Sequence, residues 1–197
     1  MSRAAVLMPR GRSPAAGFDL IFTPEQIAAV LGAPLDNVRT QWPLVAAALN
    51  SYGIFNRAVA IAAIATVGVE AGNFWPIEEY RNADGSIPHY WHGYDGGWKH
   101  HGYGLIQLTH LYNHVAVADA IRERFGVDLD LANHPELLLE PRWSAFAFAW
   151  YFATHAGGAI VPRAQAGAWE AVRKLVNGGL NGYDEFRGYV RALKAIG

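Results

Sequence analysis

The feature that most constrains the fold is a nearly continuous apolar run, Ala58–Val69, which ends on the carboxylate of Glu70. A helix that is apolar on every side has to be buried, and this run is shorter than the roughly 20 residues that cross a bilayer. Asn56 can cap its start, and Pro76 prevents the helix from resuming soon after its end. The sequence therefore predicts a buried helix over residues 57–70 that carries a glutamate on its last turn.

A carboxylate in that position is disfavoured for two reasons. Burial removes its hydration, and the negative end of the helix dipole repels it. Both effects favour a protonated Glu70, which suits a general acid that works near neutral pH. The alternative interpretation is a frayed helix end with Glu70 in water.

A second carboxylate, Glu79, follows nine positions after Glu70. On an unbroken helix it would lie on the opposite face, but Gly72, Asn73 and Pro76 let the chain turn and bring it back across a cleft. Two carboxyl groups that face each other across a gap are the requirement for glycoside hydrolysis. The neighbouring Glu78 is the competitor for the role of the second carboxylate.

Composition excludes several classes of protein. The chain has 197 residues, of which 52% are hydrophobic and 13% aromatic, and this argues against disorder. Its formal net charge of −1 gives no electrostatic reason to bind nucleic acid. Because there is no cysteine, thiolate nucleophiles and cysteine-bound zinc are excluded. We expect no cofactor and no metal.

The first 19 residues contain Arg, Pro and Gly without periodicity. They predict a flexible tail or linker remnant, and residues 20–197 then form one domain. The arginines in the tail enclose no sustained apolar stretch, so no secretory signal is visible. We expect synthesis in a bacterial cytoplasm, no membrane insertion, and a monomer that could be fused to other modules.

The remaining pattern predicts a mainly α-helical fold of about eight helices with a long irregular segment over residues 74–104. A small hairpin is expected around Asn82–Gly85, a turn-forming sequence. The expected helices, besides residues 57–70, are residues 24–31, a helix from residue 35, another from Pro43 to residue 51, and residues 110–125, 135–139, 141–154, 165–176 and 183–196.

Three blocks of the sequence carry a resemblance to a known family. They are Glu70-Ala-Gly-Asn-Phe74 with Glu79 following, Gly102-Tyr-Gly-Leu-Ile-Gln107-Leu-Thr109 leading to Tyr112-Asn113, and Val176-Asn177-Gly178-Gly179 before a last helix around Asp184. In order and spacing they resemble glycoside hydrolase family 19, the chitinases and phage endolysins of the lysozyme-like superfamily. The chain departs from the family at Val69, where His is frequent, at Tyr103, where Arg is common, and at Glu185, where Arg often stands.

The resemblance implies a lysozyme-like fold and an inverting hydrolysis of β-1,4-linked N-acetylhexosamine polymers. Glu70 matches the general acid, Glu79 the general base, and Thr109 the hydroxyl that holds the attacking water. The substrate-binding side chains that we expect are Gln107, Asn113, Asn177, Tyr103 and Trp98. On local rules alone, however, Asn177-Gly178-Gly179 is simply a helix end.

Histidines and aromatic residues crowd the irregular segment, and both admit a second interpretation. His110 and His114 have the spacing of a zinc-binding helix, but Leu111 replaces the glutamate that such a motif requires. We therefore expect histidines that face the cleft and bind sugar. The rings of Tyr90, Trp91, Tyr94, Trp98 and Tyr103 either pack the loop or stack on sugars.

The sequence thus predicts an endolysin-type glycoside hydrolase whose partner is the glycan strand of bacterial peptidoglycan. A chitinase that acts on chitin oligomers is the alternative within the family. A glycan-binding module that has lost catalysis is the alternative outside it, although both Glu70 and Glu79 are present.

Overall fold

A computed structural model describes residues 19–196, so the predicted N-terminal tail lies outside the described residues except for Asp19. The elements in chain order are α1 (Pro24–Leu31), α2 (Leu35–Ser51), α3 (Arg57–Glu70), β1 (Ile77–Glu78), the 3₁₀ helices η1 (His89–Gly93) and η2 (Trp98–His100), β2 (Tyr103–Gly104), α4 (Leu111–Phe125), the 3₁₀ helix η3 (Pro135–Leu139), α5 (Pro141–Gly158), α6 (Ile160–Gln165), α7 (Trp169–Asn177) and α8 (Tyr183–Ala195). This mainly α-helical fold confirms the predicted class.

Helix α3 is buried on all sides, as its sequence requires. Every residue from Val59 to Gly68 is buried, and the helix packs against α6, α7 and α8. Its start is capped by Asn56, whose Oδ1 accepts from the Val59 amide at 3.1 Å. The helix ends on Glu70, so the predicted boundaries are confirmed.

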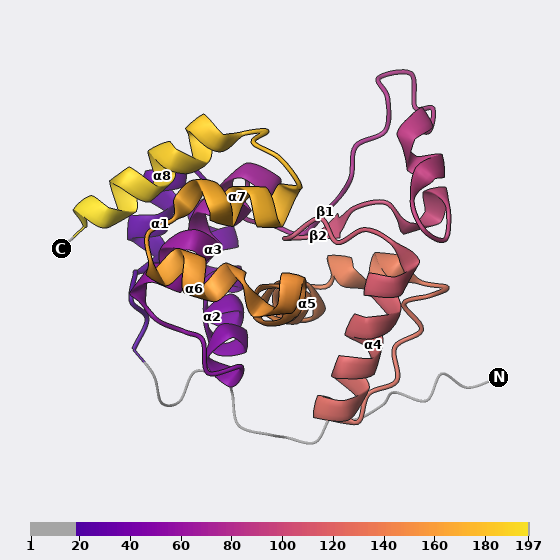
Figure 1. Ribbon diagram of the computed structural model, residues 1–197, viewed down its shortest axis with the longest axis horizontal. Coiled ribbons are helices and arrows are strands. Elements are labelled where there is room, and N and C mark those ends of the chain that lie inside the picture. The colour runs from indigo at the N-terminus through magenta and orange to yellow at the C-terminus, as the bar shows by residue number, and fades with distance from the viewer. Residues whose placement is uncertain (1–18, 197) are drawn as a thin grey trace.

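Helix α5 lies in the middle of the molecule and is seen nearly end-on in Figure 1. Its apolar and aromatic side chains are buried from Trp143 to Ala149. The helices α1, α2, α3, α6, α7 and α8 gather on one side of it, and α4 and the irregular segment lie on the other (Figure 1). In residues 19–196, no helix is both long and apolar enough to span a membrane.

Two predicted helix boundaries are wrong. Residues 35–51 form the single helix α2 with Pro43 inside it. Proline removes one backbone hydrogen bond, but burial of Trp42, Val45 and Leu49 along the same helix offsets that loss. The expected helix over residues 165–176 begins later, as α7 at Trp169, and the preceding residues 160–165 form a separate helix, α6, which ends before Gly167 adopts a left-handed φ of +68°.

The predicted hairpin around Asn82 is also wrong. These residues form a turn, closed by the Gly85 amide on the Asn82 carbonyl at 2.8 Å, but the strands that pair are β1 and β2. Their antiparallel register places Ile77 opposite Gly104 and Glu78 opposite Tyr103. The small sheet therefore joins the two ends of the irregular segment rather than two strands of a tight hairpin.

Packing around α3 generates the first prediction. A Cβ on Gly68 would lie 2.8 Å from both Leu31 Cδ2 and Tyr189 Cε2, whereas a Cβ on Gly188, in α8, would meet nothing within 4 Å. Gly68→Ala should lower the free energy of unfolding by about 1–3 kcal/mol because it overpacks the core. Gly188→Ala should raise it by up to about 1 kcal/mol because alanine favours the helix. Urea denaturation of both variants measures this, and equal effects would contradict the packing.

Candidate active site

Glu70, at the end of α3, forms an ion pair with Arg173 of α7, the guanidinium Nη1 donating to the carboxylate Oε1. The side chains are 15% and 2% exposed, respectively, so Glu70 is not at a frayed end in water. Arg173 Nε also donates to the carbonyl of Asn181 at 2.8 Å. A buried cation thus faces the Glu70 carboxylate, and its attraction for the negative charge opposes the effects of burial and the helix dipole.

Sequence reasoning missed Arg173, although its position carried a signal. Helix α7 has Trp169, Val172 and Val176 at the spacing of one helical face, and Arg173 lies between them. A charged side chain on the apolar face of a helix almost always has a buried partner. By contrast, Lys174 is exposed and pairs with Glu170 at 2.6 Å.

Glu79 accepts hydrogen bonds from three donors that the irregular segment provides. The Tyr90 hydroxyl donates to Oε1 at 2.9 Å, and the Gly102 amide donates to Oε2 at 2.8 Å. The Tyr94 hydroxyl lies 3.4 Å from Oε1 and 3.5 Å from Oε2. The backbone is fixed as well, because the Glu79 amide donates to the Gly102 carbonyl at 2.8 Å.

Glu78 faces a different partner. Its Oε1 lies 2.8 Å from His101 Nε2, and the other ring nitrogen of His101 lies 2.7 Å from the Trp98 carbonyl. A carbonyl accepts but does not donate. Nδ1 of His101 therefore donates to the Trp98 carbonyl, and Nε2 shares a hydrogen bond with the Glu78 carboxyl group. This ring is 1% exposed and stacks on Trp91 with centroids 3.8 Å apart.

The expectation of cleft-facing histidines is wrong for three of them. His100, His101 and His114 are at most 4% exposed. His114 Nε2 donates to the Leu108 carbonyl at 3.0 Å, so its Nδ1 accepts from His100 Nδ1 at 2.8 Å. Burial lowers the pKa of His114 to about 4, and burial likewise lowers the pKa of His100. These rings hold the irregular segment together from inside.

The Gly102–Thr109 block owes its residue types to close packing. Gln107 has a left-handed φ of +51°, and its Nε2 donates to the carbonyls of Ile77 and Gly104 at 2.9 Å each. A Cβ on Gly102 would lie 2.8 Å from Gln107 Oε1, and one on Gly104 would lie 2.7 Å from Ser144 Oγ. A side chain at either position would collide with these atoms. Close packing therefore explains why both positions of the Gly-x-Gly pattern are glycine.

The other predicted site residues lie in several elements of the fold. Thr109 and Asn113 are together at the start of α4, where Asn113 Nδ2 donates to the Thr109 carbonyl at 2.9 Å. Asn177 is exposed at the end of α7, the helix that provides Arg173. Trp98 is 43% exposed, but Tyr103 is only 6% exposed, which leaves little of its ring at the surface.

Tyr151 of α5 connects the two sides. Burial raises the pKa of its hydroxyl, and the nearby Tyr112 and Glu70 raise it further. The Tyr151 hydroxyl thus interacts electrostatically both with Glu70, at the end of α3, and with Tyr112, in the first turn of α4.

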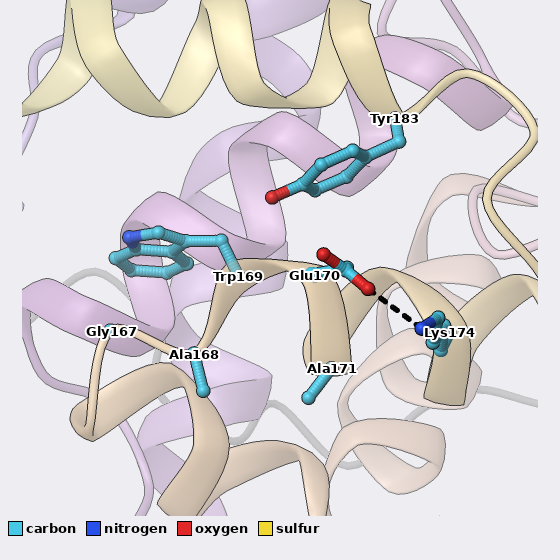
Figure 2. A pocket seen from close by; sticks show the side chains of 7 residues that line it. All are labelled: Gly167, Ala168, Trp169, Glu170, Ala171, Lys174 and Tyr183. Carbon is cyan, nitrogen blue, oxygen red and sulfur yellow. Dashed lines mark hydrogen bonds and ion pairs between the residues drawn. The ribbon is translucent and has the colours of Figure 1, made fainter.

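Two shallow hollows lie elsewhere. One, of about 430 Å³, is lined by residues 167–171, Lys174 and Tyr183, and Figure 2 shows the Glu170–Lys174 pair to the right of Trp169 and below Tyr183. The other, of about 410 Å³, shares Trp169. Neither hollow is lined by Glu70, Glu79 or the other predicted site residues. Among residues 19–196, no three His, Asp or Glu side chains are grouped to hold a metal ion.

The fold is similar to that of a chitinase. Among solved structures, the chain is similar to chitinase C from Streptomyces griseus HUT6037, with a TM-score of 0.63 and 20% identity over 87% of this chain and 76% of that one. It is also similar to a glutamate-to-glutamine mutant of chitinase C, with a TM-score of 0.60, 21% identity and the same coverage. These neighbours confirm the fold expected from the resemblance to glycoside hydrolase family 19.

Comparisons of the amino-acid sequence give no match. No model of a known protein family matches this chain, and no curated protein matches it significantly.

The buried histidines generate the second prediction. Because the pKa of His114 is about 4 in the fold, and near 6.5 in an unfolded chain, the unfolded state binds more protons between these values. The free energy of unfolding should therefore fall by about 3 kcal/mol as the pH drops from 6.5 to 4. Urea titrations at several pH values measure this. His114→Gln should reduce the dependence of the free energy of unfolding on pH. The control His89→Gln, at an exposed residue, should leave this dependence unchanged. Equal slopes in all three proteins would contradict the assignment to His114.

Proposed function

We propose that this protein is an endolysin-type glycoside hydrolase that cleaves β-1,4 bonds between amino sugars of bacterial peptidoglycan with inversion. The observation that supports it best is that, in a chitinase-like fold, both predicted carboxylates are held by dedicated partners. Glu70 is held by Arg173, and Glu79 by Tyr90, Tyr94 and Gly102.

The reaction assigns one proton transfer to each carboxyl group. In the reacting form Glu70 carries a proton on Oε2, which it gives to the glycosidic oxygen while the bond to the anomeric carbon breaks. Glu79 removes a proton from a water molecule, which attacks the anomeric carbon from the opposite face and leaves the inverted sugar. Glu70 ends as an anion and Glu79 as an acid, and exchange with solvent restores both.

Arg173 fits the acid role because it contacts Oε1 and leaves Oε2 available for the proton. As the proton leaves, the negative charge that develops on Glu70 is stabilised by a guanidinium that is already in place and shielded from water. The cation thus favours proton donation without moving.

Glu79 is a better candidate for the base than Glu78. Three donors occupy Glu79, and a carboxylate accepts about four hydrogen bonds, so there is room for one water. Glu78 instead shares a hydrogen bond with the buried ring of His101, which occupies one of its carboxyl oxygens. Thr109 is proposed to orient the water, and Gln107, Asn113, Asn177, Tyr103 and Trp98 to contact the sugars.

Peptidoglycan is the substrate that we propose first. The protein is then made in a bacterial host and acts at the cell wall. It acts as a monomer, alone or fused to other modules. Chitin is the second choice, because the similar solved structures are those of a chitinase. In both cases the substrate is a polymer of β-1,4-linked N-acetylhexosamines.

The acid is tested with Glu70→Gln, which removes the proton donor at nearly constant shape. Cleavage should fall at least about 100-fold, while glycan binding and the thermal transition stay the same. Purified peptidoglycan and chitin oligomers are digested in parallel, and the products are identified by mass spectrometry. New reducing ends from peptidoglycan establish an endolysin and those from chitin alone a chitinase. Undiminished turnover by the variant would eliminate Glu70 as the acid.

The base is tested by comparing Glu79→Gln with Glu78→Gln. Glu79→Gln should lose about 100-fold or more of the rate, and Glu78→Gln much less, because only Glu79 is proposed to receive the proton. Initial rates of reducing-end release measure both, with thermal melting as the control for folding. The reverse ranking would assign the base to Glu78.

A further inference from the structure

Tyr90 and Tyr94 contact Glu79 through their hydroxyl groups alone. The Tyr90 hydroxyl lies 2.9 Å from Oε1, and the Tyr94 hydroxyl is shared between both carboxylate oxygens at 3.4 and 3.5 Å. The two rings meet edge to face with centroids 6.2 Å apart. Together with the Gly102 amide on Oε2, the hydroxyls approach the carboxylate from two segments of chain.

The direction of these hydrogen bonds is fixed by chemistry. Burial and the adjacent Glu79 carboxylate raise the pKa of Tyr94, and the same two causes raise the pKa of Tyr90. Both phenols therefore remain protonated over the working range of an enzyme and donate to Glu79. A carboxylate that accepts several hydrogen bonds is stabilised as the anion.

The loop that carries the tyrosines is attached to α4 at Asp95, next to Tyr94. The Asp95 amide donates to His110 Nδ1 at 3.0 Å, and the Asp95 carbonyl accepts from the Leu111 amide at 2.9 Å. Its carboxylate accepts from the Tyr112 amide at 3.1 Å. The ring of His110 also packs edge to face on Tyr94 with centroids 5.1 Å apart. The position of the Tyr94 hydroxyl is therefore set by the start of α4.

From this arrangement we infer that Tyr90 and Tyr94 are positioning residues that hold the Glu79 carboxylate ionised and in one orientation, ready to take a proton from water. This inference rests on the proposed function, because it gives the tyrosines a role in the proton transfer to Glu79. Without their hydroxyls the Gly102 amide is the remaining donor. The anion is then less stable and the carboxyl group is free to rotate.

The other titratable groups around Glu79 do not replace the tyrosines. The carboxyl group of Glu78 is hydrogen-bonded to His101 at 2.8 Å rather than to Glu79. The guanidinium of Arg81 lies over the Trp91 ring, 5.9 Å from its centroid. Asp95 and His110 contact each other and the start of α4, as described above. Glu79 therefore depends on the phenols and one amide for stabilisation of its charge.

The experiment measures the pH dependence of kcat/KM for the wild type, Tyr90→Phe, Tyr94→Phe and the double variant. The substrates are soluble glycan strands from peptidoglycan and, in parallel, the hexamer of N-acetylglucosamine. The acid limb of the profile should move up by about half to one pH unit in each single variant and further in the double variant. Below that limb the rate then falls about three- to tenfold, while KM is unchanged.

Tyr80→Phe is the matched control. Tyr80 is adjacent to Glu79 in the sequence and 77% exposed, and its side chain makes none of the hydrogen bonds to Glu79. Its removal should leave the acid limb in place. Thermal melting shows whether each variant folds, and every substitution keeps the aromatic ring.

The outcomes separate the two proposals. An unmoved acid limb in the double variant, with Glu79→Gln inactive, overturns the positioning role and leaves Glu79 as the base. An unmoved limb with a raised KM also overturns it and makes the tyrosines sugar contacts. If Glu79→Gln retains full turnover, or the wild type cleaves neither substrate, the proposed function fails and the inference with it.

Discussion

The burial of α3 on every side is the constraint on which the rest of the structure depends. Its run of small and branched apolar residues has no polar face, so other helices must surround it, and α6, α7 and α8 do so. The helix therefore ends at the edge of the core and places Glu70 there. Because α7 packs against this same helix, its Arg173 reaches Glu70 from within the core, where the pair is shielded from water. The packing of the core and the position of Glu70 therefore have one cause.

The irregular segment holds its side chains firmly although it contains little regular secondary structure. Phe74 at its start, and Gln107 and His110 shortly after its end, adopt left-handed φ values between +51° and +74°. Such strain persists where surrounding contacts fix the backbone, and it is frequent at functional sites. Here the contacts are the β1–β2 pair and the side-chain bonds of Gln107. The backbone that presents Glu79 is therefore tightly determined although it is mostly loop.

Beneath this segment, the histidines and aromatic rings form a polar interior. His101 is paired at both nitrogens and stacked on Trp91, and His100 and His114 share one hydrogen bond. The carbonyls of Trp98 and Leu108 accept without donating, so Nδ1 of His101 and Nε2 of His114 carry the protons of these hydrogen bonds. Glu78 contributes to this interior, while Glu79, one residue further on, belongs to the candidate site. Two adjacent glutamates thus have distinct environments.

The sequence by itself determined the elements whose signals are local. The apolar run and Asn56 fix α3, and the Thr23–Gln26 capping box fixes the start of α1, because caps and periodicity act within a turn or two. What only the tertiary structure decided are contacts between distant residues. Glu70 and Arg173 are 103 positions apart, the β1–β2 pairing joins the ends of a long loop, and α2 continues through Pro43 because its neighbours bury it. Such choices depend on how helices pack and which donor reaches which acceptor, and no short stretch of sequence encodes that.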